Sequence, residues 1–359
     1  MSKKTKTYHE ELNVANEKKL KEQLLKLPAF CESFFMSLKD ITSSATRCGY
    51  AYDLDIFFSY LCENEAEYEG ISPAEFSLED LAKVQASHLE RYMAYLTYYE
   101  RQGEGDTVLA HSNKEKGKSR KLSAIRTLFS YLYKKEKIFA NPTELITPPK
   151  LHEKAITKLE VDEVAKLLDE VESGESLAGR AGAFHEHTKT RDLAIVTLLL
   201  GTGIRVSECV GIDITDLNFD INGVRIVRKG GDEAVIYFGH EVREALTGYL
   251  KERKMLAAKT GHENALFLSL RSTRITVRSV QNLVKKYSRP VTPLKNISPH
   301  KLRSTYGTNL YSETGDIYLV ADVLGHKDVN TTRKHYADMA DSRRRQAAKY
   351  VVLRREEGE

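Results

Sequence analysis

Apolar residues in the first third of the chain recur with the spacing of amphipathic helices. A helix is predicted from Ser43, and its apolar face follows the i, i+3, i+4, i+7 pattern with Leu54, Phe57, Phe58 and Leu61. Residues 78–100 predict one or two further helices, and residues 117–138 predict another with its own apolar stripe. Residues 101–113 contain two glycines and an aspartate and are interpreted as a loop. We therefore predict an all-helical domain over residues 43–140.

Two segments flank this predicted domain. Residues 1–42 form an N-terminal extension with an amphipathic stretch at 17–38, interrupted at Pro28, and we expect its helix to pack on the first domain. Residues 141–156 are predicted to be a linker, because the stretch from Asn141-Pro142 to Pro148-Pro149 is extended, helix-breaking sequence.

The second domain, residues 157–340, is predicted to be mostly helical with a small antiparallel sheet. Thr157, with Glu160 three residues later, predicts the start of a helix over 158–171. Residues 191–200 are apolar on nearly all sides and predict a buried central helix. Two alternating β-branched runs, 223–228 and 233–238, predict a hairpin with Lys229 at its tip. A short run at 266–270 is a candidate for one more strand. Residues 341–359 predict a basic C-terminal helix and a charged tail.

The composition is that of a soluble globular protein. The chain has 359 residues, of which 41% are hydrophobic and 30% charged, with a formal net charge of +4. No apolar run approaches the roughly 20 residues needed to span a bilayer, and the lysine-rich start lacks the apolar core of a signal peptide. The four cysteines show no paired spacing, which indicates reduced thiols. We therefore expect a cytoplasmic protein without a membrane segment.

Side chains that could take part in catalysis are concentrated between Ser298 and Tyr336. Ser298 followed by Pro299 predicts a helix start, and His300 and Arg303 then lie on one face of that helix. A second helix over 316–324 is predicted to end at a left-handed glycine, so that residue 326, a histidine, emerges just past its end. A third short helix is predicted to carry Tyr336.

Another cation lies at a predicted turn between two helices. Gly201-Thr202-Gly203 interrupts the central helix, and Arg205 follows where a long side chain can reach out of the core. An anion held by cationic groups and hydrogen-bond donors beside a free phenol is an arrangement suited to phosphoryl transfer to tyrosine. A phenol has a pKa near 10, so attack at neutral pH needs a general base and nearby positive charge.

The predicted helix at 117–138 and its entry are basic, with nine positive charges against two negative ones over residues 114–137. A solvated helix surface is the plain interpretation of such a run. Together with the phosphate chemistry above, we favour contact with a DNA backbone. The proposed DNA-binding residues are Lys114, Lys116, Lys118, Arg120, Lys121 and Arg126.

Two other ligand sites are disfavoured. Gly117-Lys118-Ser119 is like the tail of a phosphate-binding loop, but the required earlier glycine is Ser112 and no strand precedes it. His185 and His187 lack a cysteine or carboxylate partner set for a metal. We expect no cofactor and no metal.

Five sequence motifs resemble the active-site motifs of the tyrosine recombinase (phage integrase) family. They are Gly-Ile-Arg-Val-Ser-Glu at 203–208, Lys229 in the hairpin, His-Lys-Leu-Arg at 300–303, Leu-Gly-His at 324–326, and Tyr336. The resemblance covers residues 157–340 and, more weakly, the helical segment 43–138, which is similar to the family's core-binding domain. It implies a helical DNA-binding domain followed by a tyrosine recombinase catalytic domain.

The resemblance implies a role for each motif residue. Tyr336 would attack the scissile phosphate and form a 3′-phosphotyrosyl link to DNA. Arg205 and Arg303 would bind the non-bridging oxygens, and His326 would donate a further hydrogen bond to them. His300 would take the phenolic proton.

Two further residues complete the implied site. Lys229 would protonate the leaving 5′-oxygen, and Glu208 would support the site by orienting Arg205 or a histidine. Because the covalent link conserves the phosphodiester bond energy, rejoining would need neither ATP nor metal.

The implied partner is duplex DNA with a pseudo-palindromic site, bound by a homo-tetramer in which the C-terminal helix (341–353) docks on a neighbouring protomer. The enzyme would be nucleoid-associated when bound. Tyr336 lies ten positions after His326, as in many mobile-element integrases, whereas Xer-type members usually have nine, so chromosome resolution and mobile-element integration both stay open. A type IB topoisomerase and a catalytically silent DNA-binding regulator of the same fold are the alternatives.

Overall fold

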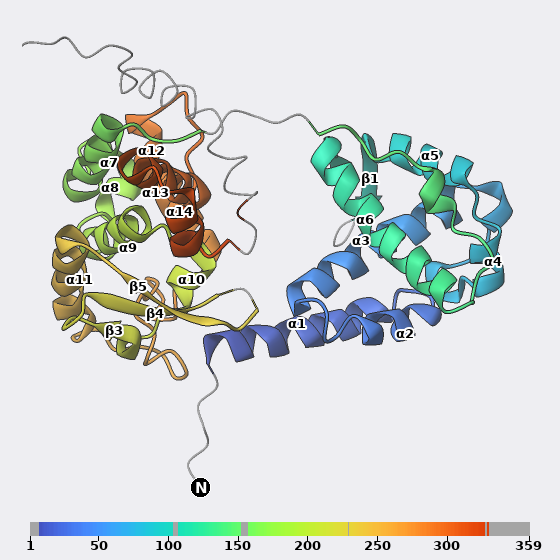
Figure 1. Cartoon of the computed structure of the whole chain (residues 1–359), viewed down its shortest axis with the longest axis horizontal. Helices are drawn as coiled ribbons and strands as arrows, with labels where there is room; N and C mark the ends of the chain where they lie inside the picture. Colours follow the sequence, from blue (N-terminus) through green and yellow to red (C-terminus); the bar gives the residue numbers. More distant parts are fainter. Residues whose placement is uncertain (1–6, 103–106, 152–156, 229, 327–328, 330–359) are drawn as a thin grey trace, which may run out of the picture. The chain divides into compact units, whose positions relative to one another are not determined.

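The computed structural model describes residues 7–102, 107–151, 157–228, 230–326 and 329, and the chain divides into two compact units, Met1–Lys154 and Ala155–Glu359 (Figure 1). The elements of the first unit are α1 (Tyr8–Leu24), α2 (Phe30–Ser37), α3 (Ser44–Asn64), the 3₁₀ turns η1 (Ala66–Tyr68) and η2 (Pro73–Glu75), α4 (Leu78–Ala82), α5 (Ala86–Tyr95), β1 (Tyr98–Gln102), β2 (Val108–Ser112), α6 (Glu115–Lys134) and η3 (Pro142–Leu145).

One apolar core holds the first unit together. It includes buried side chains from α1, α2, α3, α5 and α6, among them Leu20, Phe34, Phe57 and Phe129. The periodic residues that predicted the helix from Ser43 are all buried in this core, and Ser43 caps α3 by accepting a hydrogen bond from the backbone N–H of Thr46 at 3.2 Å. The helices α1 and α2, which lie within the expected extension 1–42, therefore contribute to the same core as α3.

The interpretation of residues 101–113 as a loop, and of the first domain as all-helical, is wrong. Residues 98–102 and 108–112 form an antiparallel hairpin in which Tyr99 pairs with His111. Tyr99 is buried and stacks on both His111 and Tyr95, with ring centroids 5.1 Å apart in each case, and Arg101 forms an ion pair with Asp55 at 2.8 Å. The glycines that suggested a loop lie only between the strands. These aromatic and ionic contacts to the helical core anchor the strands.

The elements of the second unit are α7 (Val161–Ser173), α8 (Gly179–Ala183), α9 (Lys189–Thr202), α10 (Val206–Gly211), η4 (Ile214–Asp216), β3 (Leu217–Asn218), β4 (Gly223–Val227), β5 (Glu233–Tyr237), α11 (His240–Arg253), α12 (Val277–Val291), α13 (Pro299–Thr314) and α14 (Ile317–Leu324). The predicted central helix is confirmed as α9, which packs against α7, α11 and α13.

The predicted hairpin is also confirmed, within a three-stranded antiparallel sheet of order β3-β4-β5. The strand proposed at 266–270 is wrong, because that segment makes a single isolated bridge, between Leu268 and Arg274. The predicted helix start at Thr157 is wrong as well. Glu160 caps α7, with Glu163 as its capping-box partner, and the preceding Leu159 N–H donates to Thr305 Oγ1 at 2.9 Å, which keeps this segment extended.

Among the described residues, no helix combines the length and the apolar character that a membrane crossing requires. No group of three or more His, Cys, Asp or Glu side chains suited to a metal is found in that part of the chain either.

Candidate active site

Four of the six predicted active-site residues belong to the described part of the chain: Arg205, His300, Arg303 and His326. Lys229 and Tyr336 lie outside the described residues, as does the C-terminal helix expected at 341–353.

Arg205 occupies the junction between the central helix and α10. The helix α9 ends at Gly203, whose φ of 63° is left-handed, and Arg205 is then the extended N-cap of α10. The buried carboxylate of Glu208 accepts from the Arg205 backbone N–H at 2.7 Å with one oxygen and from Arg205 Nη1 at 2.8 Å with the other. The sequence Ile-Arg-Val-Ser-Glu thus makes a capping box whose carboxylate also fixes the guanidinium.

The side chain of Arg303 is buried and crosses from α13 to two other elements. Its Nη1 donates to the carbonyl of Gly203 at 2.6 Å, and its Nη2 donates to the carbonyl of Leu324 at the end of α14. A buried guanidinium must have its donors satisfied, and here backbone carbonyls do so. Arg303 therefore ties the end of α9 to the end of α14.

The end of α14 brings Arg205 and Arg303 together. Gly325 has a left-handed φ of 61°, and the next residue, His326, donates its backbone N–H to Ala321 at 2.9 Å. The carbonyl of Gly325 accepts from Arg205 Nη2 at 3.3 Å, next in the chain to the carbonyl that binds Arg303. Two guanidiniums from separate helices thus bind consecutive carbonyls immediately before His326.

His300 lies in the first turn of α13, three residues before Arg303 and on the same helix face, with an exposed side chain. Ser298 is the N-cap residue and Pro299 the first helical residue, as predicted, but the Ser298 side chain makes no capping hydrogen bond. The helix starts through proline geometry and not through a serine cap.

Two neighbours of this site escaped the sequence analysis. Tyr306, on α13, packs against Gly203 so closely that a Cβ atom at residue 203 would overlap its ring, and burial raises the pKa of its phenol. Arg228 contacts the end of α14. In the sequence, Gly203 could have indicated that another side chain approaches the backbone closely there. The only sequence signal for Arg228 was its position next to Lys229.

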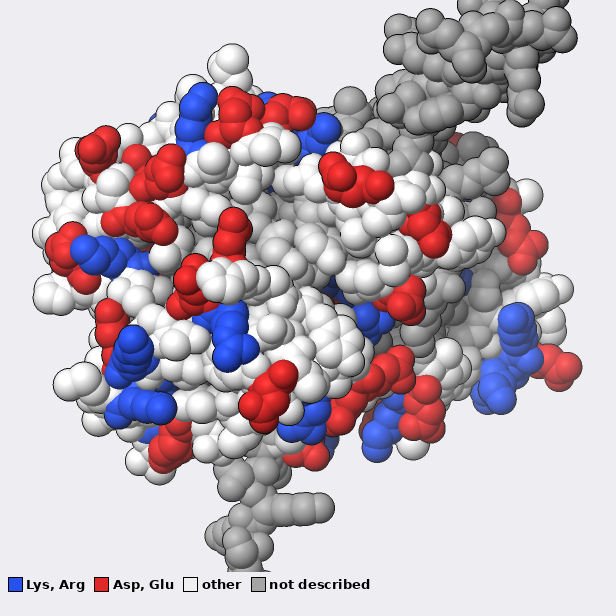
Figure 2. Space-filling model, turned by 60° about the vertical axis from the view of Figure 1, so that its left-hand side comes forward, with Lys and Arg blue, Asp and Glu red and all other residues white. Residues whose placement is uncertain are grey.

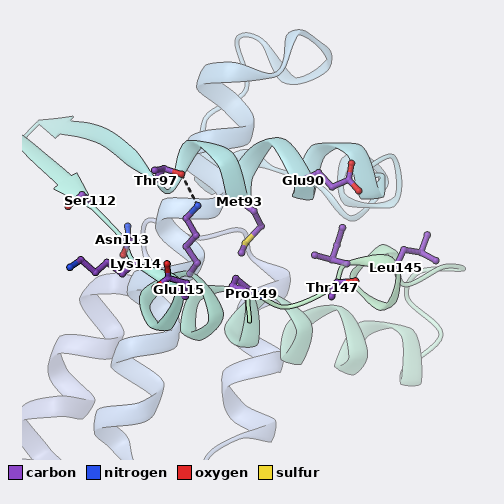
Figure 3. Close-up of a pocket in the computed structure, with 12 residues that line it drawn as sticks. Glu90, Met93, Thr97, Ser112, Asn113, Lys114, Glu115, Leu145, Thr147 and Pro149 are labelled. Atoms are coloured by element: carbon purple, nitrogen blue, oxygen red, sulfur yellow. Dashed lines mark hydrogen bonds between the residues drawn. The ribbon is translucent and has the colours of Figure 1, made fainter. Parts of the chain in front are cut away.

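The basic residues near the start of α6 differ in their exposure and in their partners. Lys114 and Lys116 are exposed. Lys118 donates to Thr97 Oγ1 at 2.7 Å across a hollow of about 710 Å³ that Met93, Asn113 and neighbouring residues line (Figure 3).

Arg120, Lys121 and Arg126 serve contacts within the unit. Arg120 and Lys121 share the fully buried carboxylate of Asp53, at 2.5 and 3.6 Å, and the Lys121 side chain is itself buried. Burial lowers the pKa of Lys121 and raises that of Asp53. Arg126 donates to the carbonyls of Thr143 and Ile146. Arg120 is nevertheless exposed. The sequence alone does not show that the Asp53 carboxylate lies beneath Arg120 and Lys121.

The face of the molecule drawn in Figure 2 carries acidic and basic side chains intermixed. This face does not show the single-sign charge that is expected of a DNA contact surface.

Comparison with known proteins gives the same family as the motifs. The phage integrase family matches residues 157–343. A tyrosine recombinase XerC from Caldanaerobacter subterraneus subsp. tengcongensis is 33% identical over 93% of this chain and 90% of its own length. A XerC from Thermodesulfovibrio yellowstonii is 30% identical over 81% of this chain and 85% of its own length.

Solved structures agree on the fold. The XerH site-specific recombinase bound to a palindromic difH substrate matches with a TM-score of 0.63 at 18% identity, covering 96% of this chain and 97% of that one. The Tn1549 transposon integrase in complex with circular intermediate DNA matches with a TM-score of 0.58 at 18% identity, covering 85% of this chain and 94% of that one.

The chain therefore belongs to the phage integrase family of tyrosine recombinases. Within that family it is a site-specific recombinase, an enzyme similar over nearly its whole length to XerC proteins.

Proposed function

We propose that the chain cuts and rejoins duplex DNA with Tyr336 as nucleophile, and that Arg205, Arg303 and His326 hold the scissile phosphate. The observation that carries the proposal is the pair of guanidiniums on consecutive carbonyls beside His326. Planar guanidinium forks suit the equatorial oxygens of a pentavalent phosphorus, where negative charge develops. Loss of one such donor is expected to cost about 3 kcal/mol of transition-state stabilisation.

The remaining roles concern protons and orientation. We assign the general base for the Tyr336 phenol to His300, whose exposed position on the Arg303 helix suits contact with an incoming substrate. Lys229 would protonate the leaving 5′-oxygen. Glu208 orients Arg205 and does not itself react, which its two hydrogen bonds to that residue support.

The DNA partner would contact the first unit at the start of α6. Lys114 and Lys116 are the best-supported contacts because they are exposed, and Lys118 could exchange its Thr97 partner for a phosphate. Lys121 and Arg126 are assigned supporting roles instead, since internal partners hold them. Arg120 pairs with Asp53 but is exposed, so it stays a proposed DNA contact.

At the level of the whole protein we propose a cytoplasmic, nucleoid-associated recombinase that assembles as a homo-tetramer on a pseudo-palindromic site. The C-terminal segment 341–359 would mediate contacts between protomers. The likeness to XerC supports chromosome resolution, whereas the ten-residue spacing from His326 to Tyr336 supports mobile-element integration.

The variant Tyr336→Phe tests the proposed chemistry. The probe is a duplex selected by binding to the wild-type protein from a random-sequence pool, and the readout is covalent protein–DNA adduct trapped with detergent. Tyr336→Phe should bind the duplex with wild-type affinity and form no adduct. The matched control is Tyr318→Phe, an exposed tyrosine on α14, which should form adduct normally.

Normal adduct yield with Tyr336→Phe would overturn the assignment of the nucleophile. Relaxation of supercoiled plasmid without strand exchange between two copies of the selected duplex would instead favour a topoisomerase.

A further inference from the structure

The carbonyl end of α14 is held by three arginines, one of which belongs to none of the family motifs. A helix leaves its last four carbonyls without partners inside the helix. At this end, the carbonyls of Ala321 and Asp322 accept backbone N–H groups, whereas those of Leu324 and Gly325 accept from Arg303 and Arg205. Arg228 Nη2 donates to the Val323 carbonyl at 3.1 Å and is a second, longer donor to the Asp322 carbonyl at 3.4 Å.

The backbone of Arg228 is fixed where β4 ends. Its N–H donates to the Asp232 carbonyl at 2.8 Å, and its own carbonyl accepts from Gly231 at 3.0 Å. The side chain therefore bridges from the β4–β5 hairpin to α14. Its guanidinium also lies against Gly325, where an added Cβ atom would overlap it.

The charge of Arg228 is well placed for this contact. The carbonyl end of a helix carries partial negative charge, and a cation there is stabilising. Arg205 and Arg303 bind the two carbonyls nearest to His326, and Arg228 binds the turn just before them. Without Arg228, two of the three side chains that fix this turn would remain.

We propose that Arg228 is a positioning residue that holds the last turn of α14, and with it His326, against the guanidiniums of Arg205 and Arg303. This inference rests on the proposed function, because it assumes that His326 donates to the scissile phosphate. Arg228 itself does not touch the reacting atoms.

A positioning role differs from a purely structural one in what its loss changes. Asp322 is exposed and Val323 half-buried, so water can reach their carbonyls once the guanidinium is gone. The fold should then lose little stability, while the position of His326 becomes less defined. Small displacements of catalytic groups reduce rate far more than binding.

The test compares Arg228→Ala and Arg228→Lys with Arg225→Ala as the matched control. Arg225 lies on β4, three residues before Arg228, but its guanidinium pairs with Asp216 at 2.6 Å and Glu233 at 3.4 Å on the hairpin surface. Adduct formation, DNA affinity and melting temperature are measured for each variant with the selected duplex, and Tyr336→Phe is included.

Arg228→Ala should slow adduct formation by about tenfold, the effect of one charge-assisted hydrogen bond, with DNA affinity unchanged. Arg228→Lys keeps the charge but cannot present a planar fork, so its rate should be intermediate. Arg225→Ala should react at the wild-type rate. In hydrogen exchange, the peptide that covers residues 317–326 should exchange faster in Arg228→Ala than in Arg225→Ala.

A wild-type rate in Arg228→Ala, or a loss of affinity and melting temperature that accounts for the whole rate change, would overturn the positioning role. If Arg228→Ala does not fold, unchanged hydrogen exchange in folded Arg228→Lys overturns it equally. Adduct that persists in Tyr336→Phe would count against the proposed function, whereas a tyrosine-dependent adduct that is insensitive to Arg228 would count against this inference alone.

Discussion

The orientation of Arg205 by Glu208 gives the sharpest prediction, through the variant Glu208→Gln. The carboxylate is buried and makes two hydrogen bonds, to the backbone N–H and to Nη1 of the same arginine. Glutamine keeps the shape and one carbonyl oxygen, so the bond to the backbone N–H can persist. Its NH₂ group then faces the Nη1 donor, and two donors cannot bind each other.

The structure sets the expected size of the effect. One charge-assisted hydrogen bond is lost inside the second unit, worth about 1.5–3 kcal/mol. We take the lower part of that range, about 2 kcal/mol, because the Arg205 side chain is one-third exposed. For a unit of this size, that corresponds to a fall in melting temperature of roughly 4–8 °C. A guanidinium that is free to turn should slow adduct formation by about 10- to 100-fold.

The assay pairs thermal unfolding with the rate of adduct formation. The matched control is Glu186→Gln, which removes a carboxylate from an exposed ion pair with Lys189 at 2.7 Å in the same unit. That control should change stability by less than about 0.5 kcal/mol and leave the rate unchanged. Wild-type stability and rate in Glu208→Gln would refute the reasoning that the carboxylate orients Arg205.

Two more predictions concern packing and pH. Gly203→Ala should destabilise the second unit by about 2–4 kcal/mol in thermal unfolding, because an added Cβ overlaps Tyr306 and φ at residue 203 is +63°; a neutral effect would contradict the close approach. Hydrogen bonds from Arg91 lower the pKa of Glu65 from its usual 4.5. The ionised carboxylate therefore stabilises the first unit fully at pH values above the pKa of Glu65 in the unfolded chain. This contribution is lost as the pH falls through the lowered pKa of the folded state. The stability gap between wild type and Glu65→Gln should shrink below about pH 4, and a gap that stays constant would refute this.

The sequence predicts those elements whose pattern is local. The helix from Ser43, the central helix and the hairpin of β4 and β5 can each be recognised from the pattern of apolar residues within that segment. The structure contains all three. The glycine at 325 likewise ends α14 as predicted, because a left-handed stop is a property of one residue.

Features that depend on a distant partner are the ones that sequence analysis misses. The strands β1 and β2 lie on either side of two glycines, and their stability comes from Tyr99 stacking on Tyr95 and from Arg101 pairing with Asp55, contacts that no local period records. The internal contacts at the start of α6 are missed in the same way, since the buried partner of Lys121 lies 68 residues earlier at Asp53. Charge seen along the chain gives no information on burial.

The carbonyls that bind Arg205 and Arg303 explain how this site can be organised before a substrate arrives. A carbonyl oxygen carries only a partial charge, so a guanidinium bound to it gains less than it would from a phosphate oxygen. In the proposed function, an anion would outcompete or share the carbonyl contacts that orient the two arginines, while Glu208 would keep Arg205 in place before and after the anion binds. Donors that are oriented in advance need little reorganisation when charge develops on phosphorus, and this is where electrostatic catalysis gains most. If the proposed function holds, the backbone at residues 324–325 is therefore part of the active site, although no side chain there reacts.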